Sequence, residues 1–252
     1  MSPYITDAAA WQESWDRQQE AYLPDREHRF AAMLDAVDAV RDTAPPRLLD
    51  LAGGTGTISL RALRRFPDAE VTLVDLDPAL LALAAASLGD RATIVTADLS
   101  QPDWPAALPH RRYDAVLTAT ALHWLPADRL ATLYAELRDL LRPGGLLVNA
   151  DHMPEDTLPE LTKRLLARAE ARRQARHAAG AALSWSQWWE QAAQNETLRP
   201  LVRQRHQIYP SGHSPEWTPP VSWHLGALSD AGFAEVGTLW RGGADAAVVA
   251  LR

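Results

Sequence analysis

The chain has 252 residues, 47% of them hydrophobic, and a formal net charge of −7. It is long enough to bury a large core, and its acidic balance argues against general attraction to nucleic acid or to anionic membranes. It contains no cysteine, which excludes disulfides, thiolate metal ligands and a cysteine nucleophile. The sequence shows neither a secretory-signal pattern nor an apolar run of about 18 residues, so we expect a cytoplasmic protein.

Short apolar runs alternate with longer amphipathic segments from residue 47 onwards, which is typical of a parallel sheet covered by helices. The predicted strands are 47–51, 70–74, 92–96, 113–118 and 146–150. The predicted helices between them are 57–66, 79–88 and 127–141, and the sequence RPGG at 142–145 is expected to end the last helix. A helix ended by Gly232 and a hairpin of strands 234–240 and 245–251 complete the chain. An open α/β sheet finished by a hairpin is the predicted fold.

A glycine-rich turn follows the first predicted strand, in the sequence LLDLAGGTGTISL at 48–60. Ligands of open parallel sheets bind beyond the carboxyl ends of the strands, where such a turn lies. Gly53, Gly54 and Gly56 permit backbone conformations closed to other residues and let a ligand approach the main chain. Asp75 ends the second strand, at the position where doubly wound folds place an acid that binds ribose hydroxyls. The pattern predicts a nucleoside-bearing ligand.

Ser59 stands where the dinucleotide pattern G-x-G-x-x-G needs its third glycine, which argues against a pyrophosphate. The sequence DLAGGTG at 50–56 instead resembles the first motif of the class I S-adenosylmethionine-dependent methyltransferases of small-molecule type. TADLSQ, YDAVLTATALHWL and LRPGGLLVNAD are similar to later motifs of that family, in the same order, so the resemblance covers most of the chain. Ala52 is a departure, because the family usually has glycine there.

The resemblance implies a Rossmann-like α/β fold: a seven-stranded, mostly parallel sheet with a reversed last strand, helices on both faces and a helical insertion as a lid. It implies S-adenosyl-L-methionine as the cofactor, S-adenosyl-L-homocysteine as its product, a ribose contact at Asp75 and adenine contacts at Asp98 and Leu99. The expected cofactor-binding residues are Trp15, Tyr22, Asp50, Ala52, Gly53, Gly54, Gly56, Asp75, Leu76, Asp98, Leu99 and Thr118. Asp77, before Pro78, is expected to cap a helix instead.

Four segments are expected on this basis. Residues 1–45 form an N-terminal helical lid, 46–152 the cofactor-binding core, 153–221 a helical substrate cap and 222–252 the helix and hairpin that complete the core. Arg26 joins Trp15 and Tyr22 as an expected lid contact.

Histidine is the usual base if the methyl acceptor is a hydroxyl group. His152 and His123 follow predicted strands, and His213 lies in the insertion; we expect His152 first and His123 second as the base. Asp151 is adjacent to His152, but neighbouring residues on a strand point to opposite faces, which weakens that pairing. No metal-ligand spacing is found, and TATA at 118–121 replaces the Asn-Pro-Pro-Tyr motif of enzymes that methylate nucleic-acid amino groups.

The expected function is methylation of a small-molecule metabolite or natural product at an oxygen atom, in a monomer or a homodimer. A protein that binds the cofactor without catalysis is the alternative. An NAD(P)-dependent oxidoreductase is disfavoured by Ser59 and by the terminal hairpin.

Two features of the insertion have two interpretations each. Trp185, Trp188 and Trp189 follow the capping-box pattern SWSQ, and they either pack the insertion onto the sheet or enclose a flat acceptor. The arginine-rich helix at 163–180 is expected to be an amphipathic cover with a solvated basic face, and a basic rim for an acidic acceptor stays open.

Overall fold

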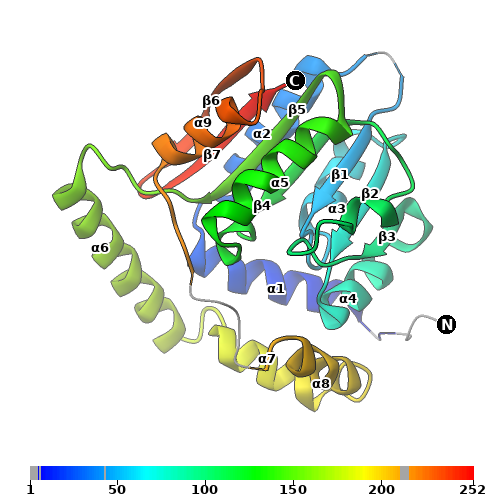
Figure 1. The fold of residues 1–252 in the computed structure, drawn as a ribbon. Helices are drawn as coiled ribbons and strands as arrows, with labels where there is room; N and C mark the ends of the chain where they lie inside the picture. Colours follow the sequence, from blue (N-terminus) through cyan, green and yellow to red (C-terminus); the bar gives the residue numbers. More distant parts are fainter. Residues whose placement is uncertain (1–4, 6, 43, 211–215) are drawn as a thin grey trace.

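The computed structural model describes residue 5 and residues 7–42, 44–210 and 216–252. Within them lies a seven-stranded sheet with the strand order β3-β2-β1-β4-β5-β7-β6 (Figure 1). The strands are β1 (Arg47–Leu51), β2 (Glu70–Asp75), β3 (Ala92–Thr96), β4 (Tyr113–Ala119), β5 (Leu141–His152), β6 (Glu235–Gly242) and β7 (Asp245–Leu251). The first five strands are parallel, and β7 is antiparallel to both of its neighbours. The predicted Rossmann-like α/β fold is therefore confirmed.

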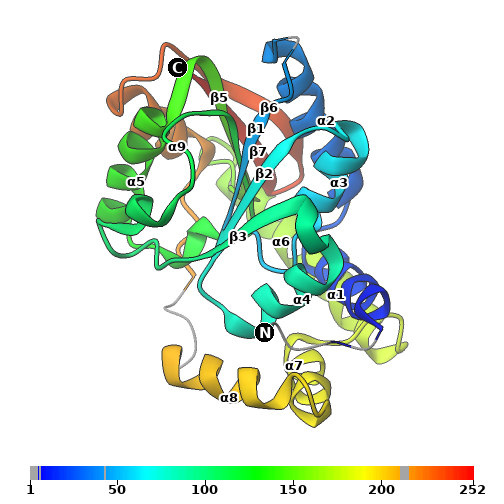
Figure 2. The same ribbon diagram turned by 90° about the vertical axis from the view of Figure 1, so that its right-hand side faces the viewer.

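Helices cover both faces of the sheet (Figure 2). The described helices are α1 (Ala8–Tyr22), α2 (Arg26–Val40), α3 (Thr57–Arg65), α4 (Pro78–Leu88), α5 (Ala127–Leu140), α6 (Pro159–Ala178), α7 (Trp185–Gln194), α8 (Arg199–Ile208) and α9 (Val221–Asp230). Successive side chains of a strand point to opposite faces, so Leu48 packs with α2, α3 and α4 whereas Leu49 packs with α5 and α9. Both faces of the central strands are thereby buried.

A third apolar cluster joins α1, α7 and α8 to α4. Trp15 of α1 contacts Trp185, Trp188 and Trp189 of α7, with ring centroids 5.8, 4.8 and 6.5 Å away. Trp188 is fully buried and Trp189 nearly so, which makes them packing residues. Trp185 and Trp15 also line the cavity described below, and enclosure of an acceptor by them stays a prediction.

The helix α5 ends just before the sequence RPGG, as expected, but β5 begins earlier than expected. The helix ends at Leu140, and β5 already begins at Leu141. The pairing jumps from Tyr113 with Leu141 to Ala115 with Leu146, so the intervening residues bulge out of the ladder. Gly144 takes a left-handed φ of 74° within this bulge and donates its amide hydrogen to the Arg252 carbonyl. The strand consequently starts earlier than its apolar run.

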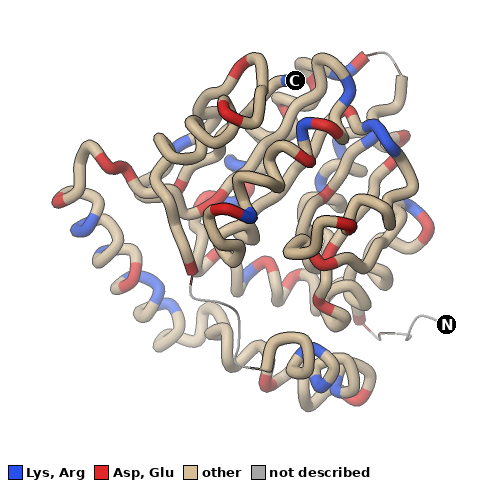
Figure 3. The backbone as a smooth tube through the Cα atoms, in the orientation of Figure 1, with Lys and Arg blue, Asp and Glu red and all other residues tan. Residues whose placement is uncertain are grey.

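The helix α6 differs from the expected amphipathic cover. Thr162 is its one buried residue, while Leu161, Leu165 and Leu166 are 51%, 38% and 48% exposed. Basic residues also recur along the helix (Figure 3). Leu165 and Leu166 stay exposed because they line a cavity between α6 and the hairpin of β6 and β7, whereas Leu161 does not line it. The apolar side of α6 therefore faces a space and not a packed core.

Candidate active site

The turn after β1 is shaped by its glycines and by one strained alanine. A side chain on Gly53 would place its Cβ 2.8 Å from both Asp50 Cγ and Leu73 Cγ, so only glycine fits there. Gly54 and Gly56 adopt φ angles of 56° and 83°. Ala52 has a φ of 51°, in the left-handed region that costs an ordinary residue about 1–2 kcal/mol. The family whose first motif residues 50–56 resemble usually has glycine at this position, and glycine would remove that strain.

We expect Ala52→Gly to raise the free energy of unfolding by about 1 kcal/mol, because relief of the left-handed strain exceeds the extra chain entropy of glycine. Urea denaturation followed by circular dichroism measures this. Ala31→Gly is the matched control: Ala31 is exposed within α2, and glycine there should lower the stability by about 0.5–1 kcal/mol. Equal destabilisation by both substitutions would show that position 52 is unstrained.

Asp50, Asp75 and Asp98 stand at or just after the carboxyl ends of β1, β2 and β3. Asp50 Oδ2 accepts hydrogen bonds from the Ser59 amide and hydroxyl at 2.9 and 2.6 Å, which ties the first turn of α3 to β1. Asp75 accepts from the amides of Leu76 and Asp77 through Oδ1 and from the Gly54 amide through Oδ2. Burial raises the pKa of Asp50 to about 6, and the pKa of Asp75 is also raised by burial. The turn is thus built around two buried carboxyl groups.

A cavity of about 820 Å³ opens at this edge of the sheet. The expected cofactor-binding residues that line it are Trp15, Tyr22, Asp50, Ala52, Gly53, Gly54, Asp75, Leu76, Asp98 and Leu99. Two others do not line it. Gly56 shapes the turn as the N-cap of α3, and Thr118 is fully buried because it points to the opposite side of β4 from Ala119, which does line the cavity. Thr118 is therefore an interior residue of β4 and not, as expected, a residue of the cavity.

Two histidine–aspartate pairs lie side by side at the cavity. Nδ1 of His123 is 2.7 Å from Oδ1 of Asp151, and Nδ1 of His152 is 2.7 Å from Oδ1 of Asp245. The two imidazole centroids are 6.1 Å apart, and both rings line the cavity. The His152 ring therefore pairs with Asp245 and not with its neighbour Asp151, whose side chain pairs with His123. The His152 amide, in contrast, donates to Asp151 Oδ1. His213 lies outside the described residues.

The charges around the two pairs shift their protonation. Burial lowers the pKa of His152, but the hydrogen bond and charge of Asp245 and the charge of Asp151 raise it more, so the net shift is upward. Burial raises the pKa of Asp151, but the charge and hydrogen bond of His123 lower it more. Arg29, which is fully buried, lies 3.5 Å from Asp245 Oδ2. The site therefore favours the ionised form of the Asp151 carboxyl group.

Comparison with known proteins identifies the core. Residues 48–145 match a family model described as "Methyltransferase domain". This segment of the chain is therefore similar to methyltransferase domains. The region matched runs from β1 into β5 and includes the glycine turn and all three strand-end aspartates.

Alignments to individual proteins cover a larger part of the chain than the family model does. A trans-aconitate 2-methyltransferase from Streptomyces avermitilis is 33% identical over 138 residues, which cover 53% of this chain and 49% of that protein. A malonyl-[acyl-carrier protein] O-methyltransferase from Halalkalibacterium halodurans is 29% identical over 138 residues, with the same coverage. The chain spans about half the length of these curated relatives. Human N-acetylserotonin methyltransferase, solved with S-adenosylmethionine, shares the fold with a TM-score of 0.55 and 15% identity, over 97% of this chain and 58% of that one.

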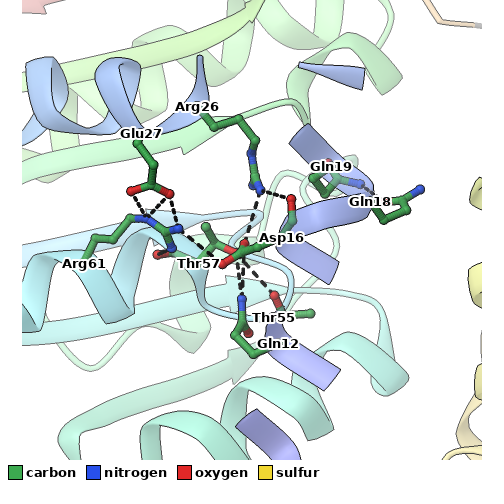
Figure 4. A network of polar contacts seen from close by, with 9 residues as sticks. All are labelled: Gln12, Asp16, Gln18, Gln19, Arg26, Glu27, Thr55, Thr57 and Arg61. Atoms are coloured by element: carbon green, nitrogen blue, oxygen red, sulfur yellow. Dashed lines mark hydrogen bonds and ion pairs between the residues drawn. The ribbon is translucent and has the colours of Figure 1, made fainter. Parts of the chain in front are cut away.

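The N-terminal helix is fastened to the region that matches the family model by a polar network (Figure 4). The Asp16 carboxylate accepts hydrogen bonds from Thr57, Arg26 and Arg61 at 2.8, 3.2 and 3.2 Å, and Gln12 donates to the Thr57 hydroxyl at 2.9 Å. Thr57 is the first residue of α3, directly after the glycine turn. The network therefore holds α1 over the turn, with Arg26 buried at the cavity wall.

One cavity residue has no signal in the sequence. Arg205 of α8 forms a buried ion pair with Asp77, whose Oδ2 lies 2.6 Å from Arg205 Nε. Its guanidinium also lies 4.1 Å from the ring centroid of Trp189. Asp77 Oδ1 accepts from the Ala79 and Leu80 amides, which confirms the predicted helix cap. The second role of Asp77 depends on a helix far along the chain, so a local pattern does not indicate it.

The described residues provide neither a metal-binding cluster nor a membrane-spanning helix. No three histidine or carboxylate side chains there converge closely enough to hold a metal ion. Among the described helices, none combines the length and the apolar character needed to span a bilayer.

Proposed function

We propose that this chain transfers a methyl group from S-adenosylmethionine to an oxygen atom of a small-molecule acceptor, with His152 as the base. The observation that carries the proposal is the position of the His152–Asp245 pair, whose imidazole lines the same cavity as the strand-end aspartates. The name of one relative, an O-methyltransferase, agrees with an oxygen acceptor.

The glycine turn fits the methyl donor. Asp50 Oδ1 is buried and has no hydrogen-bond partner among the described residues, so it can accept a hydrogen bond from the donor's ammonium group. The Asp75 carboxylate has about four acceptor positions, three of which are used by amides, and the fourth can accept a ribose hydroxyl. Gly53 keeps the main chain clear of side chains. When bound here, S-adenosylmethionine supplies an electrophilic methyl carbon on a positively charged sulfur.

The chemistry left to the protein is alignment of the acceptor and removal of its proton. Asp245 fixes the tautomer of His152: a carboxylate accepts, so Nδ1 carries the hydrogen and Nε2 keeps its lone pair. Nε2 can then take the proton of an acceptor hydroxyl. His152 is better placed for this than His123, because its side chain is 26% exposed whereas that of His123 is 7% exposed. We assign His123 and Asp151 to positioning the acceptor.

The upward pKa shift of His152 sets the pH dependence. Protonated imidazole has no lone pair at Nε2, so kcat/KM should fall as the pH drops through the raised pKa of His152. Asp245→Asn removes the charge that raises this pKa, and the acidic limb of the pH profile should move to lower pH. Asp139→Asn, an exposed aspartate far from the site, is the control and should leave the limb unchanged. An unmoved limb in Asp245→Asn would remove His152 from the role of base.

Two measurements distinguish the proposal from its alternatives. Calorimetric titration with S-adenosylhomocysteine and with NADH should show saturable binding of the first only; tighter binding of NADH would favour an oxidoreductase. Incubation of the purified chain with a cell extract and radioactively methyl-labelled S-adenosylmethionine should yield a labelled small molecule that is absent when the chain is left out. Donor binding without any labelled product would favour a non-catalytic binding protein.

A further inference from the structure

A second cavity, of about 540 Å³, lies between α6, the turn that joins β6 to β7, and the segment between α1 and α2. From α6 it is lined by Leu165, Leu166 and Ala169 among others. The turn contributes residues 242–245, which include Asp245. No part of the proposed donor site requires this space.

The second cavity meets the donor cavity at two residues. His152 and Tyr22 line both. The imidazole that we propose as the base therefore stands where the two spaces adjoin, and Asp245, which orients it, belongs to the wall of the second one. A molecule in the second cavity could bring a hydroxyl group to Nε2 of His152 while its remainder stays between α6 and the hairpin.

The chemistry of the wall favours an apolar molecule. Leu165 and Leu166 are 38% and 48% exposed, so binding there would remove apolar surface from water. The charges between them and the base are largely paired. Arg173 binds Glu170 and lies over the Tyr22 ring, 4.7 Å from its centroid.

The other charged residues of the wall are paired or exposed to solvent. Asp245 is paired with His152. Asp25 and Arg172 carry opposite charges and are both exposed to solvent, where an ion interacts weakly with a ligand. The wall thus combines an apolar stretch on α6 with charged side chains that are paired or exposed to solvent, and one imidazole lines it.

We infer that the second cavity binds the methyl acceptor, and that the acceptor is a molecule with an apolar body, a ring or an alkyl chain, that bears a hydroxyl group at the end near His152. This inference rests on the proposed function. It specifies the class of substrate and assigns the exposed leucines of α6 to substrate binding.

The test uses 4-alkylphenols, from 4-methylphenol to 4-butylphenol, titrated calorimetrically into the full chain saturated with S-adenosylhomocysteine. The dissociation constant should fall by about fourfold for each added methylene, since each buried methylene contributes about 0.8 kcal/mol. Leu166→Asp should weaken 4-butylphenol at least about tenfold, because it places a charge in the apolar wall. Leu161→Asp is the matched control, since Leu161 is exposed on the same helix but does not line the cavity, and it should change the constant less than about twofold.

Three results would overturn the inference: no binding of any phenol by the wild type, no dependence on chain length, or equal weakening by the two leucine substitutions. The saturation step separates these from failure of the proposed function. If the wild-type chain does not bind S-adenosylhomocysteine, the donor site itself is wrong. If it binds S-adenosylhomocysteine but not the phenols, only the assignment of the second cavity fails.

Discussion

His152→Gln is expected to lower kcat by about a hundredfold to ten-thousandfold, the usual contribution of a general base. The substitution removes the lone pair that takes the acceptor's proton, while glutamine keeps a polar side chain beside Asp245. Affinity for S-adenosylhomocysteine should change little, because the donor contacts that we propose come from the β1 and β2 ends. Initial rates of label transfer to the acceptor, together with calorimetric donor binding, measure the two effects separately.

His123→Gln is the comparison for that result. Its imidazole is held by the buried Asp151 and has little exposed surface, so its loss should raise KM for the acceptor more than it lowers kcat. A larger fall in kcat for His123→Gln than for His152→Gln would exchange the two roles. An unchanged kcat in both variants would indicate that the acceptor needs no base.

Asp75→Ala is expected to weaken S-adenosylhomocysteine binding by about tenfold to a hundredfold. The estimate is the loss of one hydrogen bond to a charged acceptor, about 1.5–3 kcal/mol. The carboxylate has one acceptor position left after its three backbone amides, and we assign that position to a ribose hydroxyl. Calorimetry gives the affinity, and thermal unfolding reports whether the turn survives the substitution.

The ligand supplies a control for collapse of the turn. The wild type should bind S-adenosylhomocysteine more tightly than one of its 2′-deoxy or 3′-deoxy analogues, and this preference should disappear in Asp75→Ala. If the variant binds all three ligands more weakly but keeps the wild-type preference, Asp75 acts only on the backbone of the turn.

The sheet was predictable because its signals are local. Apolar runs bounded by turn residues fix the strands, and the alternation of strand and helix fixes the parallel order. The start of β5 was not predictable, since the bulge at RPGG depends on pairing with β4 and on the Arg252 carbonyl. The exposed leucines of α6 show the same limit: helical spacing indicates an apolar side but not whether another element covers it.

The residues of the site were likewise predictable only where their signals are local. Asp75 ends β2 and Asp98 follows β3, so position along the chain is enough to bring them to one edge of the sheet. The partners of the histidines could not be found like this, because Asp245 lies 93 residues from His152 and the antiparallel pairing of β5 with β7 brings them together. Thr118 was misplaced because one residue along a strand changes the face.

The central claim is that the chain moves a methyl group from S-adenosylmethionine to oxygen with His152 as the base. The most direct measurement is incubation of the purified chain with ¹³C-methyl S-adenosylmethionine and a cell extract, followed by mass spectrometry and NMR of the labelled product. We predict a single ¹³C methyl group bonded to oxygen, formed by the wild type and at least about a hundredfold more slowly by His152→Gln. A methyl group on carbon or nitrogen, or equal rates for the two proteins, would contradict the account.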